Sequence, residues 1–305
     1  MSYHSLYKTD IENFLTENET LIKKATIHKI ILLVIWTIIT LLGITGFQVE
    51  LLFGIFSTAI AFMVTGLIVQ TISIREYNNI VKNSIKYFKE ISEYNPDKKP
   101  EHYLTLDLFG YSNINQTELK YILKDNNYSY QVYDQFIINI NSQIIDYSTQ
   151  EMRIYAKTRT SNERKDITLW NGQLFAKKHN MKHDYTMIIS NTDDFKPRPI
   201  KVQDTNYAPF CQTYNVSVSD QGIFNDWNFP NLNDIIQQIN SIIPSFSIII
   251  TNKTIILAIY FAGINYFDPV LWRANVKKNL ERDFEYLSKI IEISKLITQI
   301  DIIEK

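Results

Sequence analysis

The stretch “GITGFQVE”, residues 43–50, divides a hydrophobic tract that otherwise runs from Ile30 to Ile74. A helix needs about 20 apolar residues to cross a bilayer, because the hydrocarbon layer is about 30 Å thick and each residue adds about 1.5 Å. The runs Ile30–Phe47 and Leu51–Ile74 both meet this length, and neither contains Asp, Glu, Lys, Arg or His. A single helix through both runs would be about twice too long for a bilayer.

The connecting segment has the composition of a break between two helices. Gly43 and Gly46 weaken a helix locally. Gln48 and Glu50 supply strongly polar side chains between the two runs. We therefore expect a transmembrane hairpin over residues 30–74. A buried hairpin of a soluble protein is the alternative, but uncharged runs of this length are rare there. A cleaved signal peptide is disfavoured, because a polar segment precedes the first run and the run is too long.

Basic residues near the ends of the two runs predict the orientation of the hairpin. Residues 43–50 contain no Lys or Arg. Basic residues flank the outer ends of both runs: Lys23, Lys24, Lys29, Arg75, Lys82, Lys86 and Lys89. We therefore expect a multi-pass protein of the cell membrane with both termini in the cytoplasm.

The amino-acid composition indicates the cellular compartment of the protein and excludes one class of partner. A single cysteine, Cys211, among 305 residues is too little for an internal disulfide framework and is typical of a reducing compartment. A formal net charge of −1 provides no overall attraction to nucleic acid, so we expect no nucleic-acid partner. The bias toward Ile, Asn, Lys and Tyr is typical of AT-rich bacterial genomes.

The second apolar run carries a stripe of small side chains at helical spacing, which consists of Gly54, Thr58, Ala61 and Thr65. Small residues allow two helix backbones to approach closely in lipid. The stripe therefore predicts packing against the first helix of the hairpin or, alternatively, a homo-oligomer that forms through this face. Ionisable residues that would mark an ion or proton pathway are absent from both runs.

Helical periodicity continues on both sides of the hairpin. We expect residues 1–29 to contain a cytosolic amphipathic helix, from about residue 9 to residue 27, that Thr9 or Asp10 caps. Residues 75–100 are predicted to form a juxtamembrane helix to about residue 93, followed by a linker that contains two prolines.

Residues 271–305 are predicted to form a C-terminal amphipathic helix. Its heptad-like apolar stripe favours packing on residues 75–93, on residues 9–27 or on a second copy of the chain. The stripe consists of Val276, Leu280, Phe284, Leu287, Ile291, Leu296, Ile297 and Ile300. Asp283, Glu285 and Glu292 occur among its polar residues, whereas membrane-surface helices prefer a basic polar face.

Residues 101–270 are expected to form one mostly antiparallel α+β domain in the cytosol, so the fold class is α+β. Its clearest element is the hairpin “FSIIIT-NK-TIILAIYF”, in which Asn252-Lys253 forms the turn and Ile249 lies opposite Ile256. A helix over Leu232–Ile243 precedes it, capped by Asn231 and stopped by Pro244. Other strands are predicted in β-rich runs, and the predicted core includes Phe175, Ile188, Val216, Ile249 and Ile256. These runs are “YQVYDQFIINI”, “EMRIYAK”, “GQLFAKK”, “DYTMIIS” and “TYNVSVS”.

Three segments resemble an uncharacterised family of bacterial membrane proteins, domain of unknown function 3137. They are “LWNGQLF” (169–175), “FCQTYNVSVSDQ” (210–221) and “IILAIYFAGINYFDPVL”. Trp170 and Asn171 stand where the family more often has Phe and Lys, and Tyr214 replaces a Phe. The resemblance covers most of the chain in order. It implies a two-helix membrane hairpin with a cytosolic domain, and it brings no known activity.

Candidate catalytic or ligand-binding groups are few, and we assign no catalytic residue, metal or cofactor. His179 and His183 are spaced so that a helix could bind a metal with both, but no Cys or acidic cluster completes a zinc set. Cys211 has no neighbouring His, which favours a buried thiol over a nucleophile. Asp220, between Ser219 and Gln221, favours a turn. The glycines form no phosphate-binding loop or dinucleotide fingerprint.

Two clusters of basic residues could contact anionic lipid if they face the bilayer, and solvated hairpin tips are the alternative. One cluster comprises Lys177, Lys178, Lys182 and the two histidines, and the other comprises Lys157, Arg159, Arg164 and Lys165. We expect a membrane-anchored interaction or scaffold protein that binds another protein or itself. The alternative is a membrane-surface enzyme with a polar site around Asp220.

Overall fold

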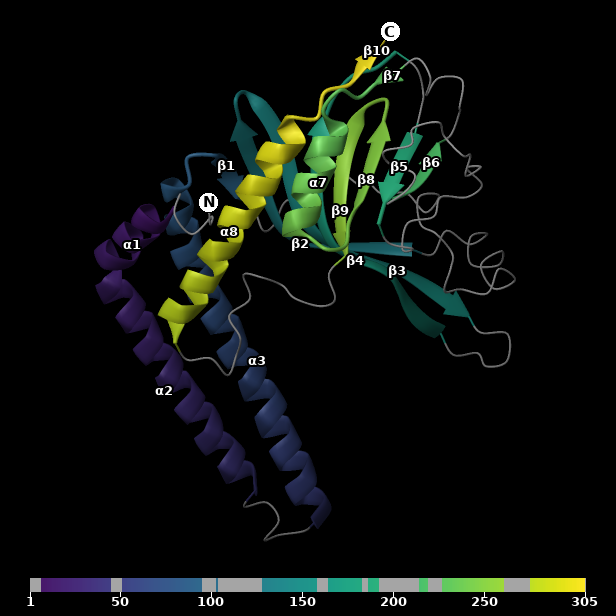
Figure 1. Ribbon diagram of the computed structural model, residues 1–305. Coiled ribbons are helices and arrows are strands. Elements are labelled where there is room, and N and C mark those ends of the chain that lie inside the picture. The colour runs from purple at the N-terminus through teal and green to yellow at the C-terminus, as the bar shows by residue number, and fades with distance from the viewer. Residues whose placement is uncertain are drawn as a thin grey trace. The chain divides into compact units, whose positions relative to one another are not determined.

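The computed structural model describes most of the chain as a set of helices and an antiparallel sheet (Figure 1). The described residues are 7–44, 51–94, 103, 128–157, 164–182, 186–191, 214–218, 227–260 and 275–304. The chain divides into two compact units. The helical unit comprises residues 1–89 and 266–290, and the sheet unit comprises residues 90–265 and 291–305.

The helical unit contains two helices that are long and apolar enough to cross a membrane. They are α2 (Glu19–Ile44) and α3 (Leu51–Ser84), which flank the predicted break at residues 43–50. The unit also contains α1 (Lys8–Glu17), the short 3-10 helix η3 (Ile85–Tyr87) and residues 276–290 of α8, a helix that runs over Val276–Thr298.

The prediction of one helix over residues 9–27 is wrong, because the chain breaks between α1 and α2 at Asn18. The Asn18 side chain donates from Nδ2 to the Phe14 carbonyl at 2.9 Å, and its backbone N–H donates to the same carbonyl at 3.0 Å. Such local side-chain bonds compete with helix continuation. Capping by Thr9 or Asp10 is also wrong: α1 begins at Lys8, and Tyr7 occupies the N-cap position without a side-chain bond.

The helix of the second apolar run continues beyond Ile74, as expected, but it does not extend to residue 93. Helix α3 ends at Ser84, and β1 (Ile91–Tyr94) is a strand paired with β2 (Tyr128–Ile140), with Tyr94 opposite Phe136. Their rings stack at 4.7 Å between centroids. Cross-strand pairing therefore overrides the helical periodicity of this segment.

The sheet unit is built on an eight-stranded sheet in the described part of the chain, with the order β1-β2-β3-β4-β9-β8-β5-β6. Every neighbouring pair is antiparallel, which confirms the predicted α+β sheet. The strands are β2 (Tyr128–Ile140), β3 (Gln143–Lys157), β4 (Arg164–Lys178), β5 (Thr186–Ser190), β6 (Asn215–Val218), β8 (Ser247–Thr251) and β9 (Thr254–Tyr260). A separate pair joins β7 (Trp227–Asn228) and β10 (Ile303–Glu304).

The predicted hairpin and core of this sheet are confirmed. Residues 252–253 connect β8 to β9, and Ile249 lies opposite Ile256. All five predicted core residues are buried: Phe175, Ile188, Val216, Ile249 and Ile256. Ile188, Ile249 and Ile256 belong to one apolar cluster, which also contains Met152, Trp170, Leu174, Ala176 and Ala258.

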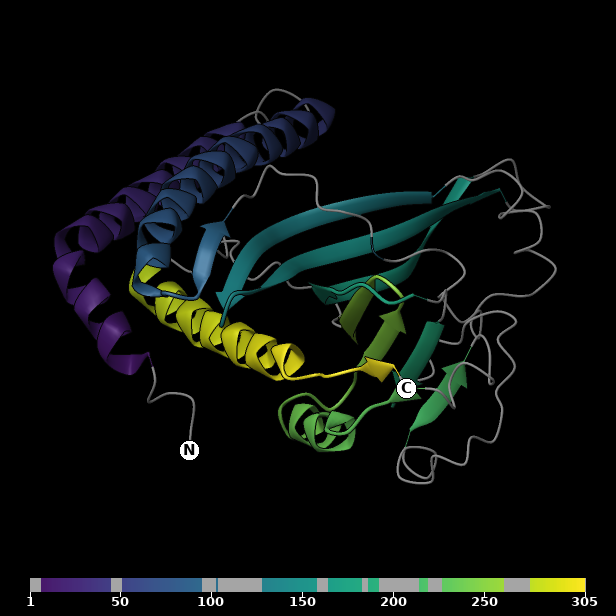
Figure 2. The ribbon, with the colours of Figure 1, turned by 90° about the horizontal axis from the view of Figure 1, so that it is seen from above.

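The C-terminal end of α8 is held against the other face of the sheet by a lysine. Lys177 lies two residues after Phe175 on β4, so both side chains are on the same face. The Lys177 Nζ donates to the carbonyls of Thr298 and Ile300 at 3.0 and 3.1 Å. A cation bonded to the last carbonyls complements the partial negative charge at a helix C-terminus. Figure 2 shows α7 (Leu232–Ile242) on this same side of the sheet.

Asn231 does not cap α7 with its side chain, contrary to the prediction. Its Nδ2 donates to the Gln299 carbonyl, and its Oδ1 accepts from the backbone N–H of Asp301 at 3.3 Å. The side chain therefore satisfies backbone groups that follow α8 instead of those at the start of α7.

Replacing Lys177 by Met should lower the free energy of unfolding of the full-length protein by about 1–2 kcal/mol, because two helix-end carbonyls lose a charged donor. Lys178→Met is the matched control, since Lys178 is exposed at the neighbouring position of the same strand. Urea unfolding in detergent measures both variants. Equal effects of the two substitutions would contradict the helix-end role of Lys177.

Candidate functional site

Most residues that the sequence singled out as chemical groups lie outside the described residues. These are His183, Cys211, Ser219, Asp220 and Gln221. His179 is described, and it is half-buried just after β4 rather than on a helix. No group of three or more His, Cys, Asp or Glu side chains that could hold a metal ion occurs among the described residues.

The environment of His179 is a hairpin contact. Its Nε2 bonds the Thr251 carbonyl, and its backbone N–H donates to the Lys253 carbonyl at 2.8 Å. Burial lowers the pKa of His179, the bond to Thr251 opposes this shift, and the charge of Lys177 lowers the pKa further. The arrangement favours a structural role for His179 at the tip of the β8–β9 hairpin.

The basic cluster around Lys177 is partly structural. Lys177 donates to the carbonyls of Thr298 and Ile300. Lys178 and Lys182 are exposed and also have interactions within the protein. Of the second cluster, Arg159 lies outside the described residues. The side chains of Lys157, Arg164 and Lys165 also lie outside the described part of the chain.

The helical unit contains a buried carboxylate that the sequence analysis placed among polar surface residues. Asp283 of α8 is 0% exposed. The Tyr77 hydroxyl of α3 donates to Asp283 Oδ2. Arg282 donates from Nε to Asp283 Oδ1 at 2.8 Å. The Nη2 atom of its guanidinium group forms an ion pair with the same oxygen at 2.6 Å. These contacts supply the partners that a buried charge requires.

Aromatic rings pack on the neighbouring residue of α8. Phe284 contacts Phe14 of α1 edge-to-face at 5.2 Å and Phe88 at 5.9 Å between ring centroids. Phe14 in turn meets Tyr87 of η3 at 5.2 Å. The apolar stripe predicted for the C-terminal helix therefore packs, within the helical unit, on α1 and on the segment after α3, which are two of the three predicted partners.

The electrostatics of Asp283 reflect this apolar setting. Burial raises the pKa of its carboxyl to about 6, while the bond from Tyr77 and the charge of Arg282 act in the opposite direction. A carboxyl whose pKa lies near neutrality can change its charge within the physiological range. Among the described residues, Asp283 is therefore the carboxyl most clearly placed to do so.

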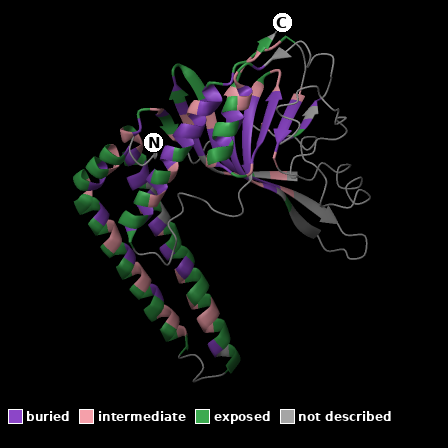
Figure 3. Ribbon diagram, viewed as in Figure 1, coloured by how far each residue is buried: buried purple, intermediate pink, exposed green. Residues whose placement is uncertain are grey.

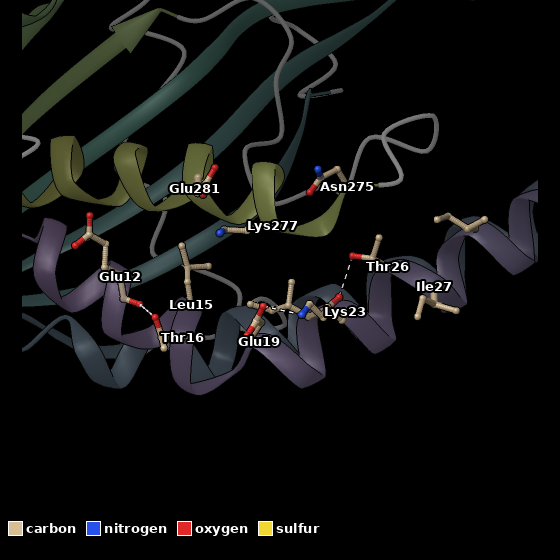
Figure 4. Close-up of a pocket in the computed structure, with 12 residues that line it drawn as sticks. Glu12, Leu15, Thr16, Glu19, Lys23, Thr26, Ile27, Asn275, Lys277 and Glu281 are labelled. Carbon is tan, nitrogen blue, oxygen red and sulfur yellow. Dashed lines mark hydrogen bonds and ion pairs between the residues drawn. The ribbon is translucent and has the colours of Figure 1, made fainter.

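Two grooves flank α8 within the helical unit. The larger has a volume of about 860 Å³ and lies between α8 and the α1–α2 segment (Figure 4). Figure 4 shows Leu15 of α1 on one side and Lys277 of α8 on the other. A second groove of about 750 Å³ shares Glu12, Leu15 and Glu281 with the first. An apolar floor with charged residues of both signs is typical of protein-recognition surfaces.

The interior of the α2–α3 hairpin is lined by small and polar groups. The carbonyl of Gly43 accepts a bond from Ser57 Oγ at 2.7 Å, and a Cβ at Gly43 would lie 3.0 Å from Thr58 Cα. Trp36 is buried and donates from Nε1 to the Phe62 carbonyl at 3.0 Å. The stripe of Gly54, Thr58, Ala61 and Thr65 therefore faces α2 near Gly43, in agreement with packing inside one hairpin.

Comparison with known proteins identifies no family: no family model, curated protein or solved structure matches the chain. The resemblance to domain of unknown function 3137 therefore stays a prediction.

The stability of the protein should depend on pH through Asp283. A folded-state pKa of about 6, against 3.8 when unperturbed, means that the folded state binds this proton more tightly. The associated stability is fully present below about pH 4 and is lost as the pH rises to 6, by about 3 kcal/mol. Asp283→Asn should remove this dependence.

Chemical unfolding of the full-length wild type and Asp283→Asn in detergent, from pH 4 to pH 7.5, measures the effect as a difference between two curves. Other carboxyls cancel in this difference because both proteins contain them. A difference that stays constant across the range would contradict the assignment of a raised pKa to Asp283.

Proposed function

We propose that the protein is a membrane-anchored cytosolic interaction or scaffold protein, with a multi-pass hairpin in the cell membrane and both termini in the cytoplasm. The observation that carries the anchor is the distribution of side chains on α2 and α3. Most large apolar side chains of α2 and α3 are exposed, and Figure 3 shows both helices mostly in the colours of exposed and intermediate residues. The contacts between the two helices include the bonds from Ser57 to the Gly43 carbonyl and from Trp36 to the Phe62 carbonyl.

The exposed fractions favour a lipid environment over a soluble core. Phe56, Met63 and Leu67 are 65%, 64% and 64% exposed, and Leu42 is 61% exposed. In the most apolar segment of each helix, only 11% of the residues in the first helix and 6% in the second are buried. A core helix of a soluble protein would bury most of this surface, whereas a bilayer provides apolar surroundings for it.

The polar contacts inside the hairpin support the same environment. Hydrocarbon offers no hydrogen-bond partners, so polar groups at that depth must be satisfied within the protein. Ser57 and Thr58 both donate to the Gly54 carbonyl, and Thr65 donates to the Ala61 carbonyl. The Trp36 Nε1–H is satisfied across the helix pair by the Phe62 carbonyl.

The interaction role rests on the grooves beside α8. The larger groove presents Leu15 and Ile22 together with Glu12, Lys23 and Glu281. A partner helix with a narrow apolar stripe and flanking charges fits such a surface. This use of the helical unit needs no catalytic group.

Single cysteines test the topology. In a Cys211→Ser background, Gln48→Cys should react with an impermeant maleimide in intact cells, because the basic residues keep the outer ends of the hairpin in the cytosol. Asp97→Cys should react only after the membrane is permeabilised. The Cys211→Ser chain itself is the unlabelled control.

Labelling of residue 97 but not residue 48 in intact cells would invert the proposed orientation. Labelling of both positions in intact cells would contradict the proposed membrane hairpin.

Charge reversal in the larger groove tests the interaction role. Lys277→Glu combined with Glu281→Lys keeps the net charge but exchanges the charges that a partner would meet. Crosslinking in native membranes should yield a discrete adduct with the wild type and at least about tenfold less with this variant, a loss typical of an altered interface charge pair. Lys89→Glu is the control outside both grooves. An adduct that survives the exchange and disappears with Lys89→Glu would contradict the groove as the interface.

A further inference from the structure

A small cleft lies between α2 and α3, immediately outside the apolar runs. It has a volume of about 220 Å³. Lys24 and His28 line it from α2, and Glu76, Asn79 and Asn83 line it from α3. The spacing of four residues on α2, and of three and four on α3, places these side chains in one row on each helix.

A hydrogen bond closes the end of the cleft nearest to the apolar runs. His28 donates from Nδ1 to Glu76 Oε1 at 2.6 Å, and both side chains are partly exposed. The carboxylate of Glu76 is therefore already bonded. The Lys24 ammonium and the amide groups of Asn79 and Asn83 bond no other side chain in the described part of the molecule, so their donors remain available to a ligand.

The depth of the cleft follows from the helical rise. His28 and Glu76 lie two residues beyond Ile30 and Ile74, which is about 3 Å along each helix, and Lys24 lies about 9 Å beyond Ile30. The headgroup layer on one side of a bilayer is about 5–7 Å thick. The end of the cleft at His28 and Glu76 therefore lies within the layer that contains lipid phosphates. By the same rise Asn79 lies about 8 Å beyond Ile74 and Asn83 about 14 Å, so Asn83 lies outside this layer. The long side chain of Lys24 can extend back toward the phosphates.

The donors of the cleft match a phosphate. An ammonium group presents three donors, and each carboxamide presents two, whereas phosphate oxygens are acceptors. The pairing of Glu76 with His28 reduces the repulsion that a free carboxylate would exert on an anion. Arg75, which is exposed and adjacent to Glu76 on α3, adds positive charge at the depth of Glu76.

We propose that this cleft binds the phosphate headgroup of an anionic membrane lipid, with Lys24 as the cation and Asn79 as a hydrogen-bond donor. The proposal rests on the membrane hairpin of the proposed function. The acyl chains of the bound lipid lie along the exposed apolar side chains of α2 and α3.

The experiment uses the full-length protein in vesicles of equimolar phosphatidylcholine and phosphatidylglycerol. After extraction into mild detergent, native mass spectrometry measures how much phosphatidylglycerol remains bound. Lys24→Gln should reduce this amount about fivefold, which corresponds to about 1 kcal/mol for one cation near the surface. Asn79→Ala should also reduce it, whereas Lys24→Arg should retain it.

Lys23→Gln is the matched control, because Lys23 is adjacent on the same helix, lines the larger groove instead of the cleft, and pairs with Glu19 at 2.7 Å. It should leave lipid retention within about twofold of the wild type, since its charge is already paired. Equal losses with Lys23→Gln and Lys24→Gln would overturn the proposal in favour of diffuse attraction to the surface.

Two further arms separate the possible failures. Inorganic phosphate in millimolar excess should not displace the lipid; displacement, together with phosphate binding to lipid-free protein, would overturn a lipid source in favour of free phosphate. Alkaline carbonate washing tests the hairpin itself. Release of the protein from the vesicles would overturn the proposed function and the lipid site together, whereas retention with no phosphatidylglycerol preference would overturn the lipid site alone.

Discussion

Close contact between α2 and α3 at Gly43 is the constraint on which the helical unit depends. The Gly43 carbonyl accepts from Ser57, and the backbone of Thr58 lies where a larger residue would need space. Gly66 lies against the Trp36 ring, whose atoms lie 3.3–3.4 Å from the point that a Cβ at residue 66 would occupy. Small residues at these points let the helices meet closely and leave room for the buried Trp36 ring, while most other large apolar side chains are exposed.

Beyond the apolar runs, the same two helices exchange their small-residue contact for ionic and aromatic ones. His28 and Glu76 form the first polar pair past the hairpin, and Tyr77 bonds the buried carboxylate of Asp283. This change agrees with the proposed anchor, because hydrocarbon favours close packing of uncharged groups and water permits charges that are paired or partly exposed. Asp283 is wholly buried, is paired with Arg282 and has a pKa raised to about 6.

The sheet unit uses a different principle, in which polar side chains satisfy the ends of helices and loops. Lys177 and Asn231 both bond backbone groups at the end of α8 and directly after it, at residues 298–301. Neither residue is close in sequence to those groups. The last turn of α8 is therefore stabilised by side chains from β4 and from the start of α7, and the basic cluster around Lys177 is partly structural.

The sequence by itself determined the local features of this protein. The two apolar runs, the β8–β9 hairpin with Ile249 opposite Ile256, and the stripe of α8 all follow from periodicity and turn composition over short distances. The tertiary structure alone decided the burial of Asp283, the strand at residues 91–94 and the partners of Lys177 and Asn231. Their contacts join residues that are far apart in the sequence, such as Tyr94 with Phe136 and Tyr77 with Asp283, which are 206 positions apart. The energy of such contacts overrides local propensity without leaving a periodic signal in the sequence.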